Sequence, residues 1–216
     1  MEKELLAQAL QMPTAYLFVD KLRAALDLEQ ARRKRFYEEV HENEKAEFIN
    51  GEVIVHSPVM KRHNVATGLI FSLFNIYVNK NNLGFVGIEK IMLRLTRNDY
   101  EPDVCFFKKQ RADAFSPTQM FFPAPDLAVE VISTSTEKID REIKFEDYAA
   151  HGVQEYWIID PDREIAEQYL LEGEKFVLNF KSKEGVIHCQ AIAGLDFPVR
   201  AIFDPSENAK ALALLF

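Results

Sequence analysis

Two acidic residues lie in otherwise apolar segments of this 216-residue sequence. Glu130 falls within the apolar run 127–132, where strand alternation places it on one face with Ala128 and Ile132. Asp103 stands at the start of a second apolar run. Each has a structural interpretation, a salt bridge or an exposed edge for Glu130 and a strand-initiating residue for Asp103. As a pair, however, two carboxylates on two sheet strands repel each other unless a cation lies between them, and their oxygen atoms suit a hard ion such as Mg²⁺ or Mn²⁺.

The segments around these carboxylates predict a mixed α/β fold. Helical spacing favours helices up to about residue 40, over 61–79 and over 137–151. Alternating or continuous apolar runs predict strands, the first two of which form a hairpin around Asn50-Gly51. The expected strand segments are 47–56, 85–95, 102–107, 126–133, 155–160, 165–171, 175–180 and 186–189. This order predicts a mixed α/β sheet flanked by helices, with an extra N-terminal helix.

The composition describes a globular protein with a well-filled core. Apolar residues make up 48% of the chain, and 17 of the residues are Phe. No apolar run approaches the roughly 20 residues that a membrane helix needs, and the N-terminus lacks the pattern of a secretory signal. The two cysteines, Cys105 and Cys189, are too few for a disulfide framework or a zinc cluster. We therefore expect a cytoplasmic protein.

The net charge of −8 argues against a protein that coats nucleic acid non-specifically, because its overall field repels phosphate. A nuclease with a local basic groove and a metal site is compatible with this charge, since a bound cation offsets its acidic ligands. The most basic stretch, 32–35, lies in the expected N-terminal helix. Either it is a solvated helix face, or it contacts phosphate.

Further motifs form an ordered set along the chain. They are Glu47, Gly51-Glu52, Ser57-Pro58, His63, Pro102-Asp103, Glu130 to Ser133, Lys144, Tyr148, Gly152 to Pro161, Gly194-Leu195 and Ile202-Phe203. In this order they resemble the Uma-two family, restriction-endonuclease-like proteins of the PD-(D/E)XK superfamily. The resemblance predicts an endonuclease-like domain over 36–203, an N-terminal helical extension over 1–35 and a C-terminal tail over 204–216. The tail is rich in Ala and Leu and is expected to add a short helix.

The resemblance implies a metal site. Asp103 and Glu130 would ligate Mg²⁺, or Mn²⁺, together with the backbone carbonyl of Val131, and the metal would activate a water that attacks phosphorus. In the superfamily a lysine usually follows two residues after the Glu, but Ile132 occupies that position here. The resemblance transfers the lysine to Lys144 on the following helix.

The supporting residues each carry two interpretations. Lys144 lies off the apolar stripe of its helix, so it is either the active-site lysine or a solvated one, with Lys138 as the reserve candidate. Glu47 either orients a water or holds a second metal, or it is a strand-edge charge. His63 either contacts phosphate or a metal-bound water, or is a capping or surface residue. Tyr148 either donates a hydrogen bond to an active-site carboxylate or packs in the core.

The leading hypothesis is a Mg²⁺-dependent endonuclease that hydrolyses DNA, with Glu47, Asp103, Glu130 and Lys144 as its catalytic residues. A homodimer is expected because cutting both strands needs two active sites, with the N-terminal helix and the Ala/Leu-rich tail as candidate interfaces. The alternative is a catalytically silent nuclease-fold module that acts in binding or assembly. A metal-dependent hydrolase with another substrate is a third hypothesis, since a fold does not fix a substrate.

Overall fold

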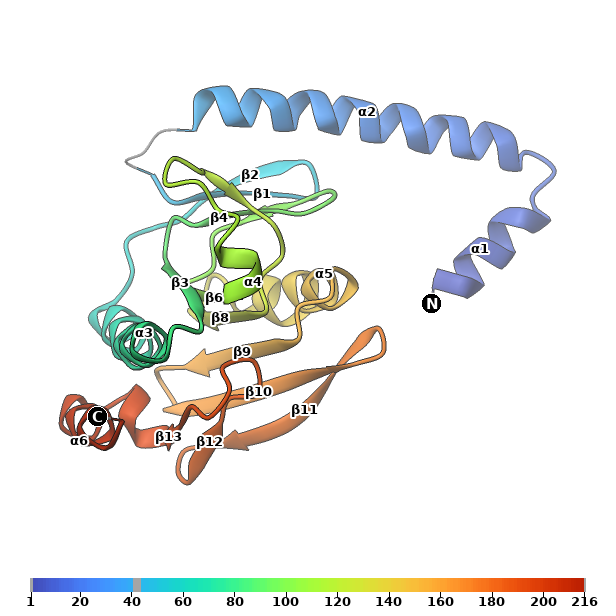
Figure 1. Cartoon of the computed structure of the whole chain (residues 1–216). Coiled ribbons are helices and arrows are strands. Elements are labelled where there is room, and N and C mark those ends of the chain that lie inside the picture. The colour runs from blue at the N-terminus through green and yellow to red at the C-terminus, as the bar shows by residue number, and fades with distance from the viewer. Residues whose placement is uncertain (1, 41–43, 216) are drawn as a thin grey trace.

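The strands are divided between two larger sheets and a two-stranded pair (Figure 1). This computed structural model describes residues 2–40 and 44–215. In spatial order the five-stranded sheet contains β2 (Glu52–Val55), β1 (Ala46–Ile49), β5 (Asp99–Tyr100), β4 (Met92–Arg94) and β7 (Phe121–Phe122). The six-stranded sheet contains β11 (Lys175–Ser182), β10 (Ile165–Glu172), β9 (Glu155–Asp160), β8 (Leu127–Val131), β6 (Val104–Lys108) and β3 (Gly84–Ile88). The pair is β12 (Val186–His188) with β13 (Asp196–Pro198).

Helices cover the sheets and extend beyond them. They are α1 (Glu2–Gln11), α2 (Ala15–Glu39), α3 (Lys61–Asn81), α4 (Lys109–Ala112), α5 (Lys144–Ala150) and α6 (Pro205–Leu214), with a π-helical turn η1 (Ile139–Ile143) and a 3₁₀ turn η2 (Val199–Ile202). In the larger sheet β8 and β9 run parallel, whereas the other neighbouring strands run antiparallel. The predicted mixed α/β fold flanked by helices is confirmed. In the described part of the chain, no helix combines the length and the apolar character that crossing a membrane requires.

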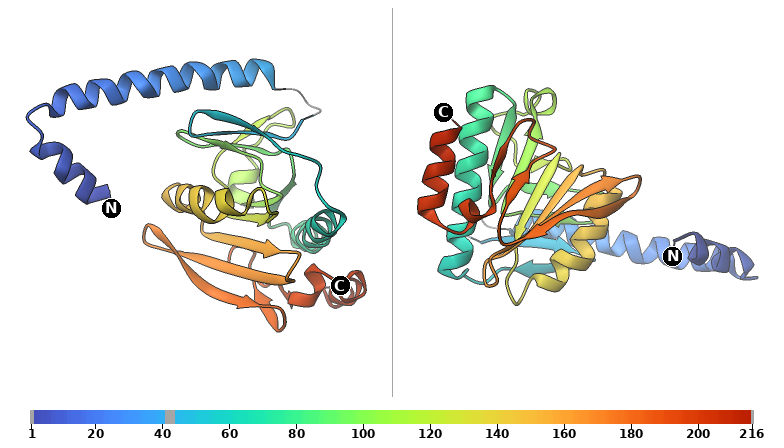
Figure 2. Two further views of the ribbon diagram at one scale, coloured as in Figure 1. Left: turned by 180° about the vertical axis from the view of Figure 1, so that it is seen from behind. Right: turned by 90° about the horizontal axis from the view of Figure 1, so that it is seen from below.

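The six-stranded sheet is packed on both faces. Figure 2 shows α3 and α6 together on one face and α5 on the other. The α3 side is filled around Phe74 and Trp157, whose rings meet edge to face at 5.3 Å. The other side is filled around Tyr148 and Tyr156. Along β8, Leu127, Val129 and Val131 join the first cluster and Ala128 joins the second, as the alternation predicts. Glu130 therefore faces α5 and the five-stranded sheet.

The predicted strand over 85–95 is wrong, because the chain changes sheets within it. It ends β3 at Ile88, turns through Glu89 and Lys90 at φ values of 42° and 28°, and then enters β4 in the other sheet. The N–H of Glu89 donates to the carbonyl of Asp103 at 3.0 Å, which fixes the turn against the start of β6. Periodicity shows which residues are apolar but not which sheet a strand joins, so it predicted one continuous strand.

The predicted single N-terminal helix is two helices, α1 and α2, and much of α2 extends beyond the sheets (Figure 1). The basic stretch in α2 is not a uniform face. Arg33 is buried, and its Nε and Nη2 contact the carboxylate of Asp99 at 2.6 and 2.7 Å. It therefore anchors the end of α2 to β5, which neither interpretation of this stretch foresaw. Helix α2 continues past residue 35 to Glu39, and the domain boundaries stay predictions.

The expected C-terminal helix is present as α6. Asp204 accepts hydrogen bonds from the backbone N–H groups of Ser206 and Glu207, which is a typical N-cap, and Pro205 occupies the first helical position. Asn208 of this helix donates to the carbonyl of Leu69 in α3 at 3.0 Å. The helix therefore braces α3, which contributes a histidine to the site described next.

Candidate active site

Antiparallel pairing between β6 and β8 brings the two predicted carboxylates together. Val104 pairs with Val129, so the preceding Asp103 and the following Glu130 are opposite each other in the continued register. Oδ2 of Asp103 accepts a hydrogen bond from the N–H of Val131 at 2.8 Å. Both carboxylates are buried. The sequence interpretation of Glu130 as an exposed edge residue is therefore wrong.

Lys144 lies at the centre of a cluster of carboxylates. Its Nζ is 3.0 Å from Oε1 of Glu47, 3.0 Å from Oε1 of Glu130 and 3.1 Å from Oδ1 of Asp140. The lysine is buried, so it is not a solvated surface residue. The reserve candidate, Lys138, has an 83% exposed side chain that lies 4.0 Å from Glu142. Of the two lysines, Lys144 is the one brought to the carboxylates.

A π-helical turn directs Lys144 inward. The backbone N–H of Lys144 donates to the carbonyl of Ile139, five residues earlier, where an α-helix would use a carbonyl four residues earlier. The predicted helix over 137–151 is thus interrupted at its first turns. The π turn contains Asp140, while the first turn of α5 contains Lys144 and the next contains Tyr148. The hydroxyl of Tyr148 donates to Oε1 of Glu130 at 3.0 Å, and its ring also packs in the core, so both interpretations of Tyr148 hold.

The remaining predicted residues flank this cluster. His63 is buried near the start of α3, with Nε2 3.3 Å from Oδ2 of Asp103, so it is not a surface residue. Glu47 is fully buried in β1, which excludes a strand-edge charge. Its Oε1 accepts a hydrogen bond from the N–H of Glu101 at 2.8 Å, and its Oε2 lies 3.0 Å from Nε2 of His56.

Sequence reasoning missed three members of the site. Lys45 lies 2.7 Å from Oδ1 of Asp103, and His56 and Asp140 make the contacts given above. Two signals were available for them. Lys45 and Glu47 are two residues apart, so they share a strand face, while Asp140 and Lys144 are four apart, as neighbours on a helix are. His56 joins through the hairpin, where its N–H donates to the carbonyl of Lys45.

The pKa values of the buried carboxylates are shifted in different directions. Burial opposes ionisation of Glu47, but Lys144 and His56 hold its pKa at about 2. Burial likewise opposes ionisation of Asp103, yet His63 and Lys45 hold its pKa well below the usual range. Burial raises the pKa of Glu130 well above its usual value, and the neighbouring carboxylates raise it further, although Lys144 opposes the shift. Burial lowers the pKa of Lys144, but the carboxylates of Glu130, Glu47 and Asp140 outweigh this effect and raise it well above its usual value.

The carboxylates open onto a cavity of about 220 Å³, here called the site cavity. It is lined by Asp103, Glu130 and Lys144, by the segments 56–60 and 133–136, and by Lys45 and His63. Glu47 does not line it. Its carboxylate contacts two residues that do line the site cavity, His56 and Lys144.

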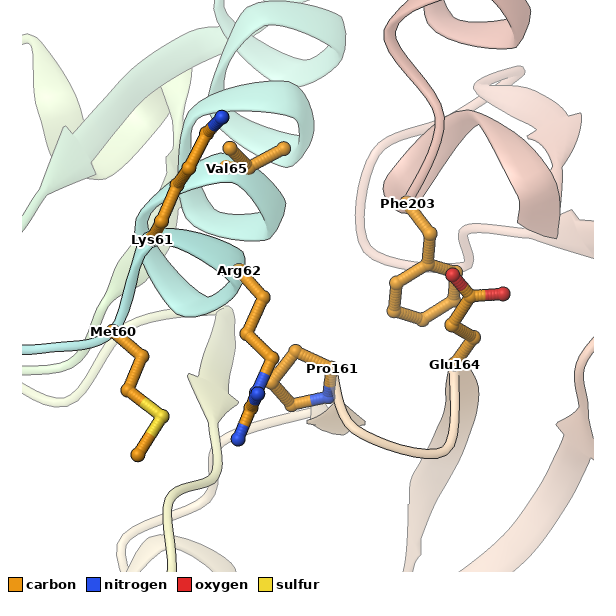
Figure 3. A pocket seen from close by; sticks show the side chains of 7 residues that line it. All are labelled: Met60, Lys61, Arg62, Val65, Pro161, Glu164 and Phe203. Carbon is orange, nitrogen blue, oxygen red and sulfur yellow. The ribbon is translucent and has the colours of Figure 1, made fainter.

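A second cleft adjoins the site cavity along the first turn of α3. Figure 3 shows this cleft, of about 380 Å³, between the start of α3 and the opposite wall formed by Pro161, Glu164 and Phe203. Met60 lines both the cleft and the site cavity. A smaller hollow that shares lining residues with each lies between them. A chain-like ligand in the site cavity could therefore continue past the basic side chains of Lys61 and Arg62.

The residues that could hold a metal ion are two carboxylates and one carbonyl. Among residues 2–40 and 44–215, no group of three or more His, Cys, Asp or Glu side chains has the geometry of a metal site. The N–H of Val131 points to Asp103, and in a strand the carbonyl of the same residue points to the same side. Asp103 and this carbonyl thus offer oxygen donors next to Glu130, the residue that precedes Val131. Such a set fits Mg²⁺, which is commonly held by one or two carboxylates and keeps several waters.

Arg141 ties the π turn to the sheet, and this tie predicts a pH-dependent stability. Its Nη1 and Nη2 contact the carboxylate of Glu167 on β10 at 3.0 and 2.9 Å. Burial opposes ionisation of Glu167, but Arg141 and its neighbours lower its pKa from 4.5 to about 2. Because the pKa is lower in the folded state, this carboxylate stabilises the protein above pH 4.5 and ceases to do so as the pH falls toward 2.

Glu167→Gln is therefore expected to lower the free energy of unfolding at pH 7, with a difference from wild type that shrinks as the pH falls from 4.5 toward 2. Urea denaturation of both proteins across this range measures it. Glu174→Gln, at an exposed position, controls for the loss of one negative charge. An equal difference at pH 7 and at the acid end would contradict the role given to the pair.

Comparisons with known proteins agree with this fold and with the nuclease resemblance. An uncharacterized protein of Synechocystis sp., slr1290, is 27% identical over 169 residues, which are 76% of this chain and 86% of that protein. A second one, sll1609, is 28% identical over 134 residues, or 61% of this chain and 75% of that protein. A crystal structure described as "a putative nuclease belonging to DUF820 from Anabaena variabilis" matches with a TM-score of 0.67.

That crystal structure is 18% identical in sequence and covers 78% of this chain and 94% of its own, so it supports the fold. The assignment of this chain to a family rests on the match to a family model. Residues 29–200 match Uma2, described as "Putative restriction endonuclease". This range contains each of the residues that line the site cavity. Because the match spans most of the chain, the protein belongs to the Uma2 family.

Proposed function

We propose that this protein is a Mg²⁺-dependent endonuclease that hydrolyses phosphodiester bonds in DNA. The observation that carries the proposal is the convergence of Asp103 and Glu130 on one buried site with Lys144, in a cavity lined by all three. Membership of a family described as "Putative restriction endonuclease" makes DNA the first substrate to test. The cleft in Figure 3, which adjoins the site cavity, leaves room for the chain on one side of the cleaved bond.

The proposed reaction assigns the metal to Asp103, Glu130 and the carbonyl of Val131. A bound Mg²⁺ supplies a Lewis acid that polarises the phosphate and lowers the pKa of a water. In the net reaction the water oxygen bonds to phosphorus and the bond from phosphorus to one bridging oxygen breaks. One water hydrogen ends on the leaving oxygen, and the other is released as a proton or stays on the new phosphate end.

The protein's own residues prepare the carboxylates for this task. Tyr148 and Lys144 both contact Oε1 of Glu130, which fixes the orientation of its carboxylate. The N–H of Val131 and Nε2 of His63 do the same for Oδ2 of Asp103. Such fixed positions matter because small displacements of catalytic groups are costly in rate.

The proposal includes a homodimer, since a single site cuts one strand at a time. Apolar side chains on α1 and α2 lie exposed in the structure and are candidate contacts, among them Leu6, Leu10 and Leu17. Sedimentation at several protein concentrations would report the association.

One observation favours the second function, a silent module used in binding or assembly. The ammonium group of Lys144 already neutralises part of the negative charge of the three carboxylates that contact it, so the cluster stabilises the fold without any metal. In that case the acidic site would persist because it stabilises the fold.

The test separates metal binding from turnover. Calorimetry with millimolar Mg²⁺ is expected to detect binding, and supercoiled plasmid is expected to be nicked or linearised with Mg²⁺ but not with a chelator. Binding without cleavage of plasmid, single strands or RNA would favour the silent module. Absence of binding for both Mg²⁺ and Mn²⁺ would sink the metal site and the proposed mechanism with it.

A further inference from the structure

Lys144 has no donor left for a substrate. Its ammonium group has three N–H donors, and carboxylates of Glu47, Glu130 and Asp140 lie within 3.1 Å of Nζ. Its side chain is only 3% exposed. A lysine in this setting holds three carboxylates together, but to reach a phosphate it would have to give one of them up.

Lys45 is placed differently. Its Nζ contacts one carboxylate, at 2.7 Å from Oδ1 of Asp103, and the structure gives it no second carboxylate among the described residues. Its side chain is 21% exposed and lines the site cavity. Two donors of the ammonium therefore remain for a group that enters the site cavity beside Asp103.

The two lysines contact different members of the carboxylate pair. Lys45 contacts Asp103, from the residue before β1, while Lys144 contacts Glu130, from the first turn of α5. A phosphate held between the two carboxylates by a cation would thus meet the ammonium of Lys45 at the cavity wall. Charge-assisted hydrogen bonds to phosphate oxygens strengthen as negative charge builds up on them in the transition state.

We propose that Lys45 is the catalytic residue that contacts a non-bridging oxygen of the substrate phosphate, and that Lys144 is a positioning residue that holds the carboxylates. The inference rests on the proposed phosphodiesterase function and adds the group that faces the substrate. Lys45 makes and breaks no covalent bond in it. Its ammonium stays protonated and stabilises the charge on the phosphate.

The experiment compares Lys45→Met and Lys45→Arg with wild type and with Lys210→Met. Lys210 is a matched control, because it too contacts one carboxylate, Glu207 at 2.6 Å, and lies on α6 away from the site cavity. Cleavage of a labelled DNA oligonucleotide in Mg²⁺ gives kcat/KM. Anisotropy of the same oligonucleotide at several salt concentrations gives its affinity, and thermal unfolding reports whether each variant folds.

Lys45→Met is expected to lower kcat/KM on the order of 10²-fold. It should also weaken oligonucleotide binding. The slope of the binding constant against salt concentration, both on logarithmic scales, should fall by about the amount that one phosphate contact contributes. The Arg variant should recover part of both losses, and Lys210→Met should match wild type. A folded Lys45→Met protein with unchanged cleavage and an unchanged salt dependence would overturn the assignment.

The two proposals fail in different ways. If wild type cleaves no nucleic acid, the proposed function fails, and the salt dependence of oligonucleotide binding then decides the role of Lys45 alone. A reduced salt dependence in Lys45→Met would keep it as a phosphate contact in a binding protein. An unchanged one, or no oligonucleotide binding by wild type, would overturn it.

Discussion

Asp103→Asn is expected to lower Mg²⁺-dependent DNA cleavage by about 10³-fold or more while the protein stays folded. A metal that polarises phosphate contributes several kcal/mol to the transition state, and each 1.4 kcal/mol is about tenfold in rate. Asparagine keeps the shape of the side chain and one oxygen for the N–H of Val131, which now contacts Oδ2. It removes the negative charge that a metal ligand needs, and it leaves Lys45 without its carboxylate partner.

Asp126→Asn is the matched control for this substitution. Asp126 is also buried, accepts a hydrogen bond from a backbone N–H at 2.8 Å and lies 3.3 Å from a cation, Arg111, but it does not line the site cavity. Both variants lose a comparable buried carboxylate, and only Asp103→Asn should lose cleavage and the calorimetric Mg²⁺ signal. Cleavage within tenfold of wild type in Asp103→Asn would show that Asp103 is not a ligand of the catalytic metal.

The carboxylate pair was predictable because it depends on short-range rules. Strand alternation over 127–132 places Glu130 on the face opposite Leu127 and Val129, and the structure agrees. Adjacent pairing of β6 with β8 then brings Asp103 opposite. Neither step needs more than a period of two residues and the common tendency of successive strands to be neighbours.

The orientation of Lys144 was not predictable from the helical period. An α-helix advances by roughly 100° per residue, so a turn that closes over five residues instead of four shifts every later side chain around the axis. The predicted apolar stripe, through Ile139, Ile143, Ala149 and Ala150, assumes one uninterrupted helix, and Lys144 lies off that stripe. The π turn ends at Ile143, and Lys144 is the residue directly after it.

Lys45 and Arg33 were missed for a different reason, because their partners are distant in the sequence. The contact of Lys45 with Asp103 spans 58 residues, and that of Arg33 with Asp99 spans 66. The contact of Lys45 depends on how the five-stranded sheet packs beside the larger one, and that of Arg33 depends on how α2 packs against β5. The spacing of Lys45 and Glu47 places both on one strand face, but it does not indicate Asp103 as the partner of Lys45, because the predicted strand over 85–95 hid the passage between the sheets. Nothing in the sequence pairs Arg33 with Asp99.

Lys144→Met is expected to lower the free energy of unfolding by about 3–5 kcal/mol at neutral pH, because it removes the cation from a buried cluster of carboxylates. Urea denaturation in a chelator measures this without a contribution from metal binding. Lys138→Met, at an exposed lysine 4.0 Å from one carboxylate, is the control and should change stability by about 0.5 kcal/mol or less.

The pH dependence identifies the cause of that loss. The Glu47 carboxylate, whose pKa of about 2 depends on Lys144, would bind a proton at higher pH in the variant, and protonation of the cluster would remove the repulsion. The difference from wild type should therefore shrink as the pH falls. If Lys144→Met does not fold at pH 7, the double variant with Glu130→Gln, which removes one of the three contacting charges, should recover folding. A loss below about 1 kcal/mol, or one independent of pH, would mean that the lysine's charge is not what holds these carboxylates in place.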